Sequence, residues 1–309
     1  MVRWLFLSCF FCASLFSESF VTYEFSGGRF GDCLLSYLHA KWLSYTYQIP
    51  LLYRPFPYSS ELALHEKEKR YQPFYLLKHS MVKLGASLPC PAGGSCIYEC
   101  PYFPTIPDNE WEDPQTYRFS IDWNNEEFKN IAREMIAPLR PLQLTLPPKN
   151  TINIALHIRE GGGFEKGLFH FPLKMPPLSF YLEAFSKILA EFEGFSIYCY
   201  LFTDALEPAR LAKKLQKAVP QGAPVFIDYR KKGNHHAANV LEDFFSFFHF
   251  DVLICPQSNY SGVAAAMGDF AMTYFPVGFS RNKKKATITE SRLEKNEAVY
   301  QQVIKRVSP

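Results

Sequence analysis

Residues 151–163 read TINIALHIREGGG: an apolar run rich in β-branched residues that ends in two charged residues and three glycines. Short apolar runs bounded by turn residues are typical of strands that are buried on both faces of a sheet. Similar runs recur at residues 197–203, 225–227, 252–255 and 272–275. The repetition predicts a parallel sheet, which begins with a strand over 152–158.

The segments between these runs have the spacing of helices. Strands that alternate with helices of ten or so residues build βαβ units. We therefore predict an α/β domain over residues 149–280, followed by an exposed amphipathic helix at 290–306 in the C-terminal segment 281–309. The predicted internal helices span residues 178–192, 208–218, 240–248 and 261–267.

The N-terminal half has a weaker pattern. A short strand-like run at 20–25 leads into the glycine-rich turn SGGRFGD at 26–32 and then into a helix in which apolar residues recur every three or four positions. Residues 50–120 are rich in Pro and Tyr and are predicted to be loops with a few short elements. Four prolines within 138–150 predict a linker, so we place an N-terminal α/β domain at 20–148.

The composition of the chain argues against some classes of function. The chain has 309 residues, and 33 Lys and Arg against 30 Asp and Glu give a net charge of only +3. This balance argues against a strongly basic nucleic-acid binder. Aromatic residues make up 17% of the chain, which predicts large cores and stacking surfaces.

The first 19 residues have the features of a signal peptide. Arg3 precedes an apolar run, Trp4 to Phe16, and small residues follow it. That run is shorter than the roughly 20 residues of a membrane-spanning helix. We expect export or membrane association through this segment, or a cytoplasmic protein if residues 1–19 are not a signal.

The cysteines do not predict a metal site. Cys90, Cys96 and Cys100 cluster in a loop rich in Pro and Gly, where two of them could form a disulfide if the protein is exported, or remain free thiols. Their spacing does not match paired zinc ligands. Cys199 and Cys255 lie in strand-like runs and are expected in the core.

Polar residues follow three of the predicted strands. His157 and Arg159 follow the first, Thr203 and Asp204 follow the second, and a Ser-rich turn at 258–261 leads into a helix. Ligands of doubly wound sheets lie beyond the carboxyl ends of the strands. A guanidinium and a helix N-terminus both favour phosphate, so together they predict a diphosphate site, although singly each has a common structural role.

The order of these motifs resembles the GDP-fucose-dependent fucosyltransferases, which include α-1,2-, α-1,6- and protein O-fucosyltransferases. The matching pieces are His-x-Arg at 157–159, the Thr-Asp pair at 203–204, the acidic residue that opens a short helix at Asp243, and the Ser-Asn-Tyr-Ser turn at 258–261. The glycine-rich turn at 27–32 is similar to the opening motif of the α-1,2 group. The resemblance covers mainly residues 151–276.

The resemblance implies a GT-B-like fold of two Rossmann-like domains, with the donor held in the C-terminal one and no divalent metal or other cofactor. It implies that Arg159 holds the β-phosphate and that Asp243 accepts hydrogen bonds from guanine. The implied donor-binding residues are His157, Arg159, Asp204, Asp243, Ser258, Asn259, Tyr260 and Ser261. The implied N-terminal glycine loop comprises Gly27, Gly28, Arg29, Gly31 and Asp32.

The implied activity is metal-independent, inverting transfer of a sugar, expected to be fucose, from a GDP-sugar to a hydroxyl of a glycan or protein. Such transfer needs a carboxylate base. The resemblance points to Glu165, which precedes Phe169-His170, and Glu160 is the second candidate. The acidic residue usual after His-x-Arg-x-Gly is absent, and Gly161 to Gly163 stand there instead.

Two other functions remain open. The apparent export signal and the altered glycine loop fit an exported, catalytically inactive protein that binds carbohydrate or a host partner on the same fold. A dinucleotide-dependent oxidoreductase is disfavoured, because SGGRFGD is not GxGxxG and no acidic residue follows a second strand at the expected ~20 residues.

Overall fold

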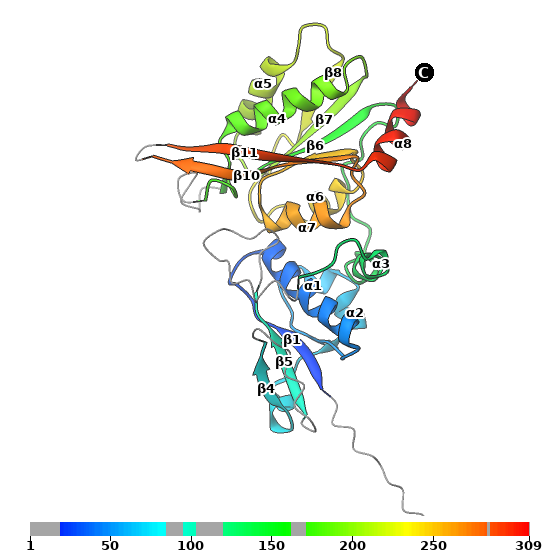
Figure 1. Cartoon of the computed structure of the whole chain (residues 1–309), viewed down its shortest axis with the longest axis vertical. Coiled ribbons are helices and arrows are strands. Elements are labelled where there is room, and N and C mark those ends of the chain that lie inside the picture. Colours follow the sequence, from blue (N-terminus) through cyan, green and yellow to red (C-terminus); the bar gives the residue numbers. More distant parts are fainter. Residues whose placement is uncertain (1–18, 85–94, 103–119, 162–170, 283–284, 309) are drawn as a thin grey trace, which may run out of the picture.

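The computed structural model contains two α/β units, an N-terminal one built on short parallel strands and a C-terminal one built on a six-stranded, mostly parallel sheet (Figure 1). The N-terminal unit comprises the elements from β1 to α3, and the C-terminal unit those from β6 to α8. The structure describes residues 19–84, 95–102, 120–161, 171–282 and 285–308.

The C-terminal sheet has six strands in the order β11-β10-β9-β6-β7-β8. Every neighbouring pair is parallel except β10 with β11. The chain order therefore reverses between β6 and β9, which is the point where doubly wound sheets bind ligands. The strands are β6 (Ile152–Ile158), β7 (Ile197–Thr203), β8 (Val225–Tyr229), β9 (Val252–Ile254), β10 (Met272–Arg281) and β11 (Ala286–Lys295).

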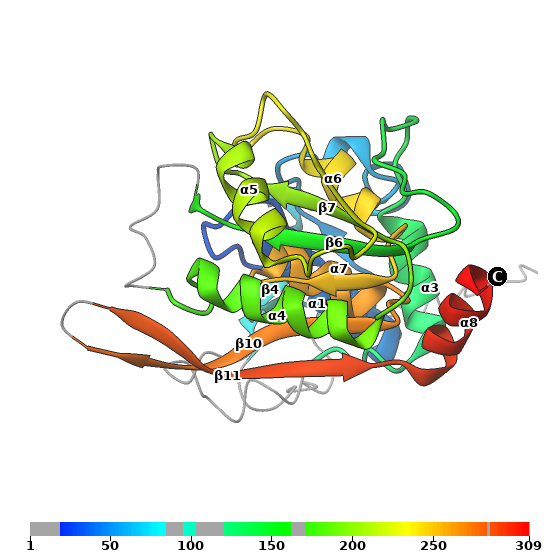
Figure 2. The same cartoon turned by 90° about the horizontal axis from the view of Figure 1, so that it is seen from above.

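Helices cover both faces of this sheet. On one face, α4, α5 and α8 bury apolar side chains against β6, β7 and β9. On the other face, α6 and α7 lie between the sheet and the N-terminal unit, as Figures 1 and 2 show. The helices are α4 (Leu178–Glu191), α5 (Pro208–Ala218), α6 (Val240–Phe247), α7 (Asn259–Met267) and α8 (Glu297–Val307).

The strands of the N-terminal unit are shorter, and all of their pairings are parallel. One ladder runs β1-β5-β4, a second pairs β2 with β3, and a parallel bridge between Val21 and Leu51 joins them. The strands are β1 (Phe20–Tyr23), β2 (Leu52–Tyr53), β3 (Lys69–Arg70), β4 (Ser80–Lys83) and β5 (Cys96–Cys100). The helical elements are α1 (Phe30–Tyr47), η1 (Ser59–Glu61), α2 (Leu64–Lys67), η2 (Pro73–Leu77) and α3 (Glu126–Met135).

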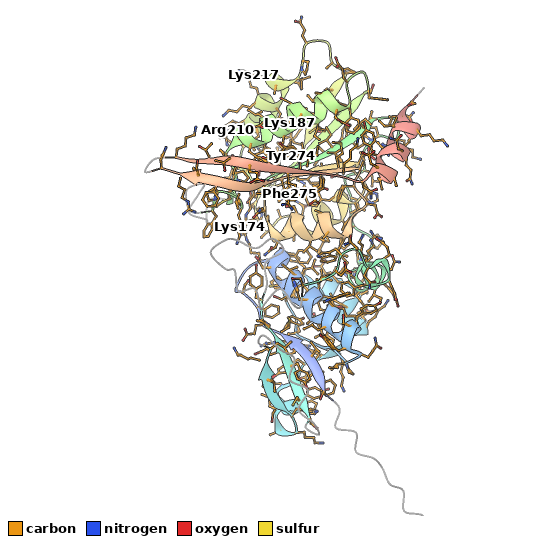
Figure 3. The ribbon with its side chains drawn as sticks, in the orientation of Figure 1. Lys174, Lys187, Arg210, Lys217, Tyr274 and Phe275 are labelled. Atoms are coloured by element: carbon orange, nitrogen blue, oxygen red, sulfur yellow. The ribbon has the colours of Figure 1, made fainter. Side chains whose placement is uncertain are left out.

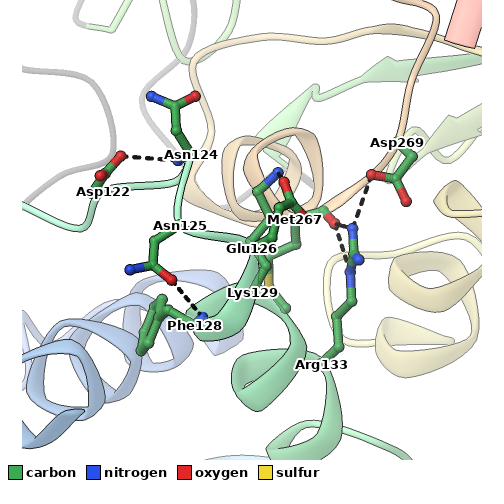
Figure 4. Close-up of polar contacts among 9 residues, drawn as sticks. All are labelled: Asp122, Asn124, Asn125, Glu126, Phe128, Lys129, Arg133, Met267 and Asp269. Atoms are coloured by element: carbon green, nitrogen blue, oxygen red, sulfur yellow. Dashed lines mark hydrogen bonds and ion pairs between the residues drawn. The ribbon is translucent and has the colours of Figure 1, made fainter. Parts of the chain in front are cut away.

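One apolar core spans both units. It contains side chains of α1 and α3 together with side chains of α6, α7 and the sheet beneath them. At its edge, the Arg133 guanidinium of α3 donates to the Met267 carbonyl at the end of α7 (Nε···O 3.0 Å) and pairs with Asp269 (Figure 4). On the opposite face of the sheet, Lys187 of α4 donates to the hydroxyl of Tyr274 on β10 (3.0 Å; Figure 3).

The predicted elements from 152 to 268 agree closely with the observed ones, but the prediction for the C-terminal end is partly wrong. We expected a last strand at 272–275 and a helix at 290–306, whereas β10 and β11 form a long hairpin that ends at Lys295. Only the part from Glu297 is helical. β11 is the edge strand of the sheet, and its residues 290–295 are exposed except for the partly buried Ser291, so this part of the strand lacks the alternation of apolar and polar residues that identifies a strand.

The cysteine prediction also needs correction. Cys96 and Cys100 lie at the two ends of the buried strand β5 rather than in a loop, and both are free thiols. Four residues of extended chain separate their Cα atoms by about 13 Å, which is too far for a disulfide. Cys199 and Cys255 are buried in the core as predicted. Cys90 lies outside the described residues.

The predicted signal segment likewise lies outside the described residues. Among the helices that the structure does describe, none combines the length and the apolar character needed to cross a bilayer.

Candidate functional site

A cavity of about 320 Å³ lies between the two units. Its C-terminal wall is formed by residues that follow β6, β7 and β8 and by the start of α7, and its N-terminal wall by the start of α1 and by Pro57 and Tyr58. It therefore opens at the carboxyl edge of the sheet, beside the point where the strand order reverses. This position is where ligands of such sheets bind.

Arg159 and the turn before α7 lie next to each other in this cavity. The Arg159 guanidinium donates from Nη1 to the Ser258 hydroxyl, with an N···O distance of 3.3 Å. Ser258 is the N-cap residue of α7, yet its side chain makes no capping hydrogen bond. The structure thus brings together the two groups for which the sequence predicted a shared diphosphate site.

His157 forms the floor beside Arg159. Its side chain is 91% buried and packs against the rings of Phe247 and Tyr260, with centroid distances of 5.7 Å. Its Nδ1 is buried without a hydrogen-bond partner. Burial, assisted by the Arg159 charge, lowers the His157 pKa to about 3, so the ring is neutral at neutral pH.

The first turns of α1 and α7 meet at the cavity. A Cβ atom on Gly31 would lie 2.5 Å from the backbone nitrogen of Tyr260, so only glycine allows this approach. Gly27 has φ of +80° in the turn before α1, a conformation that favours glycine. The glycine-rich motif therefore brings one helix N-terminus against another, and each carries partial positive charge.

Hydrogen bonds lock this junction. The Asn259 amide donates to Asp32 Oδ1 (2.6 Å) and to the Tyr102 hydroxyl (2.5 Å). Tyr102 also donates to Asp32 Oδ1, and Asp32 Oδ2 accepts from the Arg29 backbone N–H (3.2 Å). Burial and the Asp32 charge raise the Tyr102 pKa well above its usual value. Asp32 and Asn259 thus join the two walls.

At another part of the cavity wall, Asp243 is paired with Arg230. The guanidinium donates to both carboxylate oxygens, at 3.0 and 2.5 Å. Burial raises the Asp243 pKa, and the arginine opposes that change. Sequence reasoning missed Arg230, although it directly follows β8 just as Arg159 follows β6. The rule that selected Arg159 would have selected it as well.

Asp204 fixes the turn after Arg159. Its Oδ1 accepts from the Glu160 backbone N–H at 2.6 Å, and burial raises the Asp204 pKa. The Glu160 side chain pairs instead with Arg210 (2.6 Å), and Glu160 is not among the residues that line the cavity. This placement does not suit Glu160 for a role as catalytic base.

The remaining predicted site residues divide into three groups. Tyr260 lines the cavity and donates from its hydroxyl to the Val240 carbonyl (2.7 Å). Ser261 is fully buried, with its hydroxyl facing backbone carbonyls, and does not line the cavity. Glu165, the favoured base, lies outside the described residues.

A loop after β8 completes the cavity and was not predicted. His235 to Ala238 line it, and the Tyr58 hydroxyl of the N-terminal unit donates to the Ala237 carbonyl (3.0 Å). The sequence feature that could have indicated this loop is the adjacent pair His235 and His236. Two adjacent histidines in a polar loop do not have the spacing of a helix or strand motif, so no role could be predicted for them. Among the described residues, no cluster of His, Cys, Asp or Glu has the size needed to hold a metal ion.

No family model and no curated protein matches the sequence. Solved structures do match. A variant of FUT1 from Arabidopsis thaliana in complex with GDP is 10% identical with a TM-score of 0.55, over 83% of this chain and 69% of that one. POFUT1 in complex with GDP-fucose is 10% identical (TM-score 0.42; 82% and 95%). The fucosyltransferase NodZ from Bradyrhizobium is 13% identical (TM-score 0.43; 90% and 99%).

The likeness to FUT1 establishes the fold. The predicted α/β architecture, GT-B-like with two Rossmann-like parts, is confirmed at that level.

Proposed function

We propose that this chain binds a GDP-linked sugar in the cavity between its two units and transfers the sugar, expected to be fucose, to a hydroxyl of a glycan or protein. The observation that carries the proposal is the convergence of Arg159 and the N-termini of α1 and α7 on one cavity, with the buried ring of His157 in its wall. The fold shared with a protein that was solved in complex with GDP supports it.

Each group has a part in the proposed reaction. The acceptor oxygen forms a bond to C1 of the sugar as the bond from C1 to the diphosphate oxygen breaks, and the acceptor proton passes to a carboxylate base. Arg159 and the two helix N-termini stabilise the charge that develops on the departing diphosphate. We retain Glu165 as the base. The described carboxylates of the cavity, Asp32, Asp204 and Asp243, all accept structural hydrogen bonds.

The first part of the proposal, binding of a GDP-linked sugar in the cavity, is tested by measuring nucleotide affinity. Isothermal titration with GDP should give saturable binding, and Arg159→Ala should weaken it by about 10- to 150-fold, since a charge-assisted hydrogen bond contributes about 1.5–3 kcal/mol. Arg140→Ala, which removes an exposed arginine outside the cavity, is the matched control and should bind like the wild type. Equal affinity of the wild type and Arg159→Ala would remove the diphosphate site.

The second part of the proposal, transfer of the sugar to an acceptor hydroxyl, is tested by measuring turnover. Release of GDP from GDP-fucose in the presence of a glycan acceptor should be lost in Glu165→Gln, while the affinity for GDP stays within about twofold, because the base acts on the acceptor rather than on the nucleotide. Unchanged turnover would exclude Glu165 as the base. Binding of GDP without any transfer in the wild type would favour the inactive, carbohydrate-binding alternative.

A further inference from the structure

A cluster of exposed apolar side chains lies on η2 in the N-terminal unit. Phe74, Leu76 and Leu77 are 58%, 47% and 86% exposed, and we call these three residues the η2 patch. Three of the ten large apolar side chains that are exposed in the described part of the chain thus come from one five-residue turn. Apolar residues gathered in this way indicate a surface that is covered by something else.

The η2 patch is held on a fixed base. The Phe74 ring stacks on Tyr75 with a centroid distance of 4.5 Å, and Tyr75 packs against Phe20 of β1 at 5.3 Å. His79 Nδ1 lies 3.0 Å from the Tyr75 carbonyl oxygen and closes the turn. The apolar side chains are therefore presented outward by a turn that packs on the sheet.

Two basic side chains border the η2 patch. Lys69 and Lys78 are both exposed; Lys78 directly follows η2, and Lys69 Nζ lies 4.6 Å from the centre of the Phe20 ring and 5.3 Å from that of Tyr75. Lys78 forms no ion pair with any of the described residues. Of the two acidic residues nearby in sequence, Glu68 is engaged by Lys41 at 2.7 Å, and Glu66 is exposed. Apolar residues with a basic border are suited to an anionic lipid surface.

The course of the chain points to the same partner. The apolar run Trp4 to Phe16 ends four residues before Phe20, and Phe20 contacts Tyr75 within η2. Four residues can span at most about 14 Å. Any membrane that receives that run would therefore lie beside the η2 patch. Figure 1 shows β1 beginning at the same end as β4, far from α4 and α5.

We propose that the η2 patch docks on the surface of an anionic lipid membrane, with Phe74, Leu76 and Leu77 in the interfacial layer and Lys69 and Lys78 at the headgroups. This inference goes beyond sugar transfer and does not depend on nucleotide binding.

The test is flotation of the full chain with vesicles of phosphatidylcholine containing 30% phosphatidylglycerol, compared with phosphatidylcholine alone. Leu77→Asp should bind the anionic vesicles at least tenfold more weakly, because it places a charge in the interfacial layer. Leu206→Ser, which alters an equally prominent apolar residue in the C-terminal unit (77% exposed), should bind like the wild type.

Lys78→Glu should lose several-fold on anionic vesicles and nothing on neutral ones, since each basic residue near such a surface contributes about 1 kcal/mol. The matched control is Lys217→Glu on α5, at the opposite end of the molecule (Figure 3). A GDP titration of Leu77→Asp, expected to match the wild type, reports that the fold is intact and keeps this outcome separate from that of the nucleotide site.

Two results would overturn the proposal. If Leu77→Asp binds vesicles as the wild type does, the η2 patch does not touch the membrane, whether residues 1–18 bind it or cover the patch themselves. If the wild type is a dimer without lipid and Leu77→Asp is a monomer, the surface is an interface between copies of this chain.

Discussion

The two walls of the cavity are built in different ways. The C-terminal wall supplies charged side chains such as Arg159 and Asp204 from the ends of the seven-residue, buried strands β6 and β7. The N-terminal wall supplies the backbone of a helix start, brought close by Gly31, on a sheet whose strands have two to five residues. In the proposed diphosphate site, one wall would therefore contribute side-chain charge and the other the backbone N–H groups of a helix start.

Gly31→Ala should break the N-terminal wall and have the largest effect on stability. The new methyl group would sit 2.5 Å from the backbone of Tyr260, so α1 and α7 must separate. We expect a loss of about 3 kcal/mol in the free energy of unfolding, measured by urea titration. Thr46→Ala, on the exposed last turn of the same helix, should change stability by less than about 0.5 kcal/mol. A Gly31→Ala protein as stable as this control would contradict the close approach.

Asn259→Ala should weaken the connection between the walls. It removes the donor shared by Asp32 and Tyr102 and should cost about 1–3 kcal/mol of unfolding free energy. A double-mutant cycle with Tyr102→Phe should give a coupling energy of about 0.5–3 kcal/mol, because the two side chains bond directly. Additive losses would mean that the two walls are held together elsewhere, for example by Arg133.

The smallest effect that we predict is a change of stability with pH, which compares one buried histidine in each unit. The buried histidines His39 in α1 and His157 in β6 have pKa values lowered to about 4 and about 3, mainly by burial. Unfolded histidine binds its proton near pH 6.5. The unfolded chain thus binds more protons below pH 6.5, and stability must fall as pH drops from about 6.5 towards 4.

Each buried histidine should contribute up to about 1.4 kcal/mol per pH unit to that slope, measured by urea titrations between pH 6 and 4.5. His39→Gln should therefore reduce the slope, whereas replacement of the exposed His249 by Gln should preserve it. The same slope in His39→Gln and in the wild type would show that His39 is not buried neutral.

The contrast between the walls also explains what the sequence could predict. Strands β6 and β7 agree with their predicted limits at both ends, because a fully buried strand leaves a continuous apolar run. Strands β2 and β3 have two residues each and leave no periodic pattern. β11 is the edge strand of its sheet and is largely exposed, so residues 290–295 are mostly charged, and a charged segment resembles a surface helix.

The site residues likewise divide into those that the sequence could predict and those that it could not. Arg159, Ser258 and Asp204 could be found because the ends of parallel strands share an edge, which is a rule of topology. The bond between Asn259 and Tyr102 joins residues 157 positions apart in the chain, and no local pattern encodes it. The pairing of Asp243 with Arg230 could not be predicted either, because it depends on how the segment between β8 and α6 folds back on itself.

The contact between the N-termini of α1 and α7 has an electrostatic consequence for the binding of an anion. Their first turns face each other with the same sign of partial charge, and Asp32 offsets only part of it. An anion bound in the cavity beside both N-termini would be attracted by each of them. Such a ligand would therefore stabilise the contact between the two units. Its dissociation would lose the favourable interactions with both helix N-termini at once.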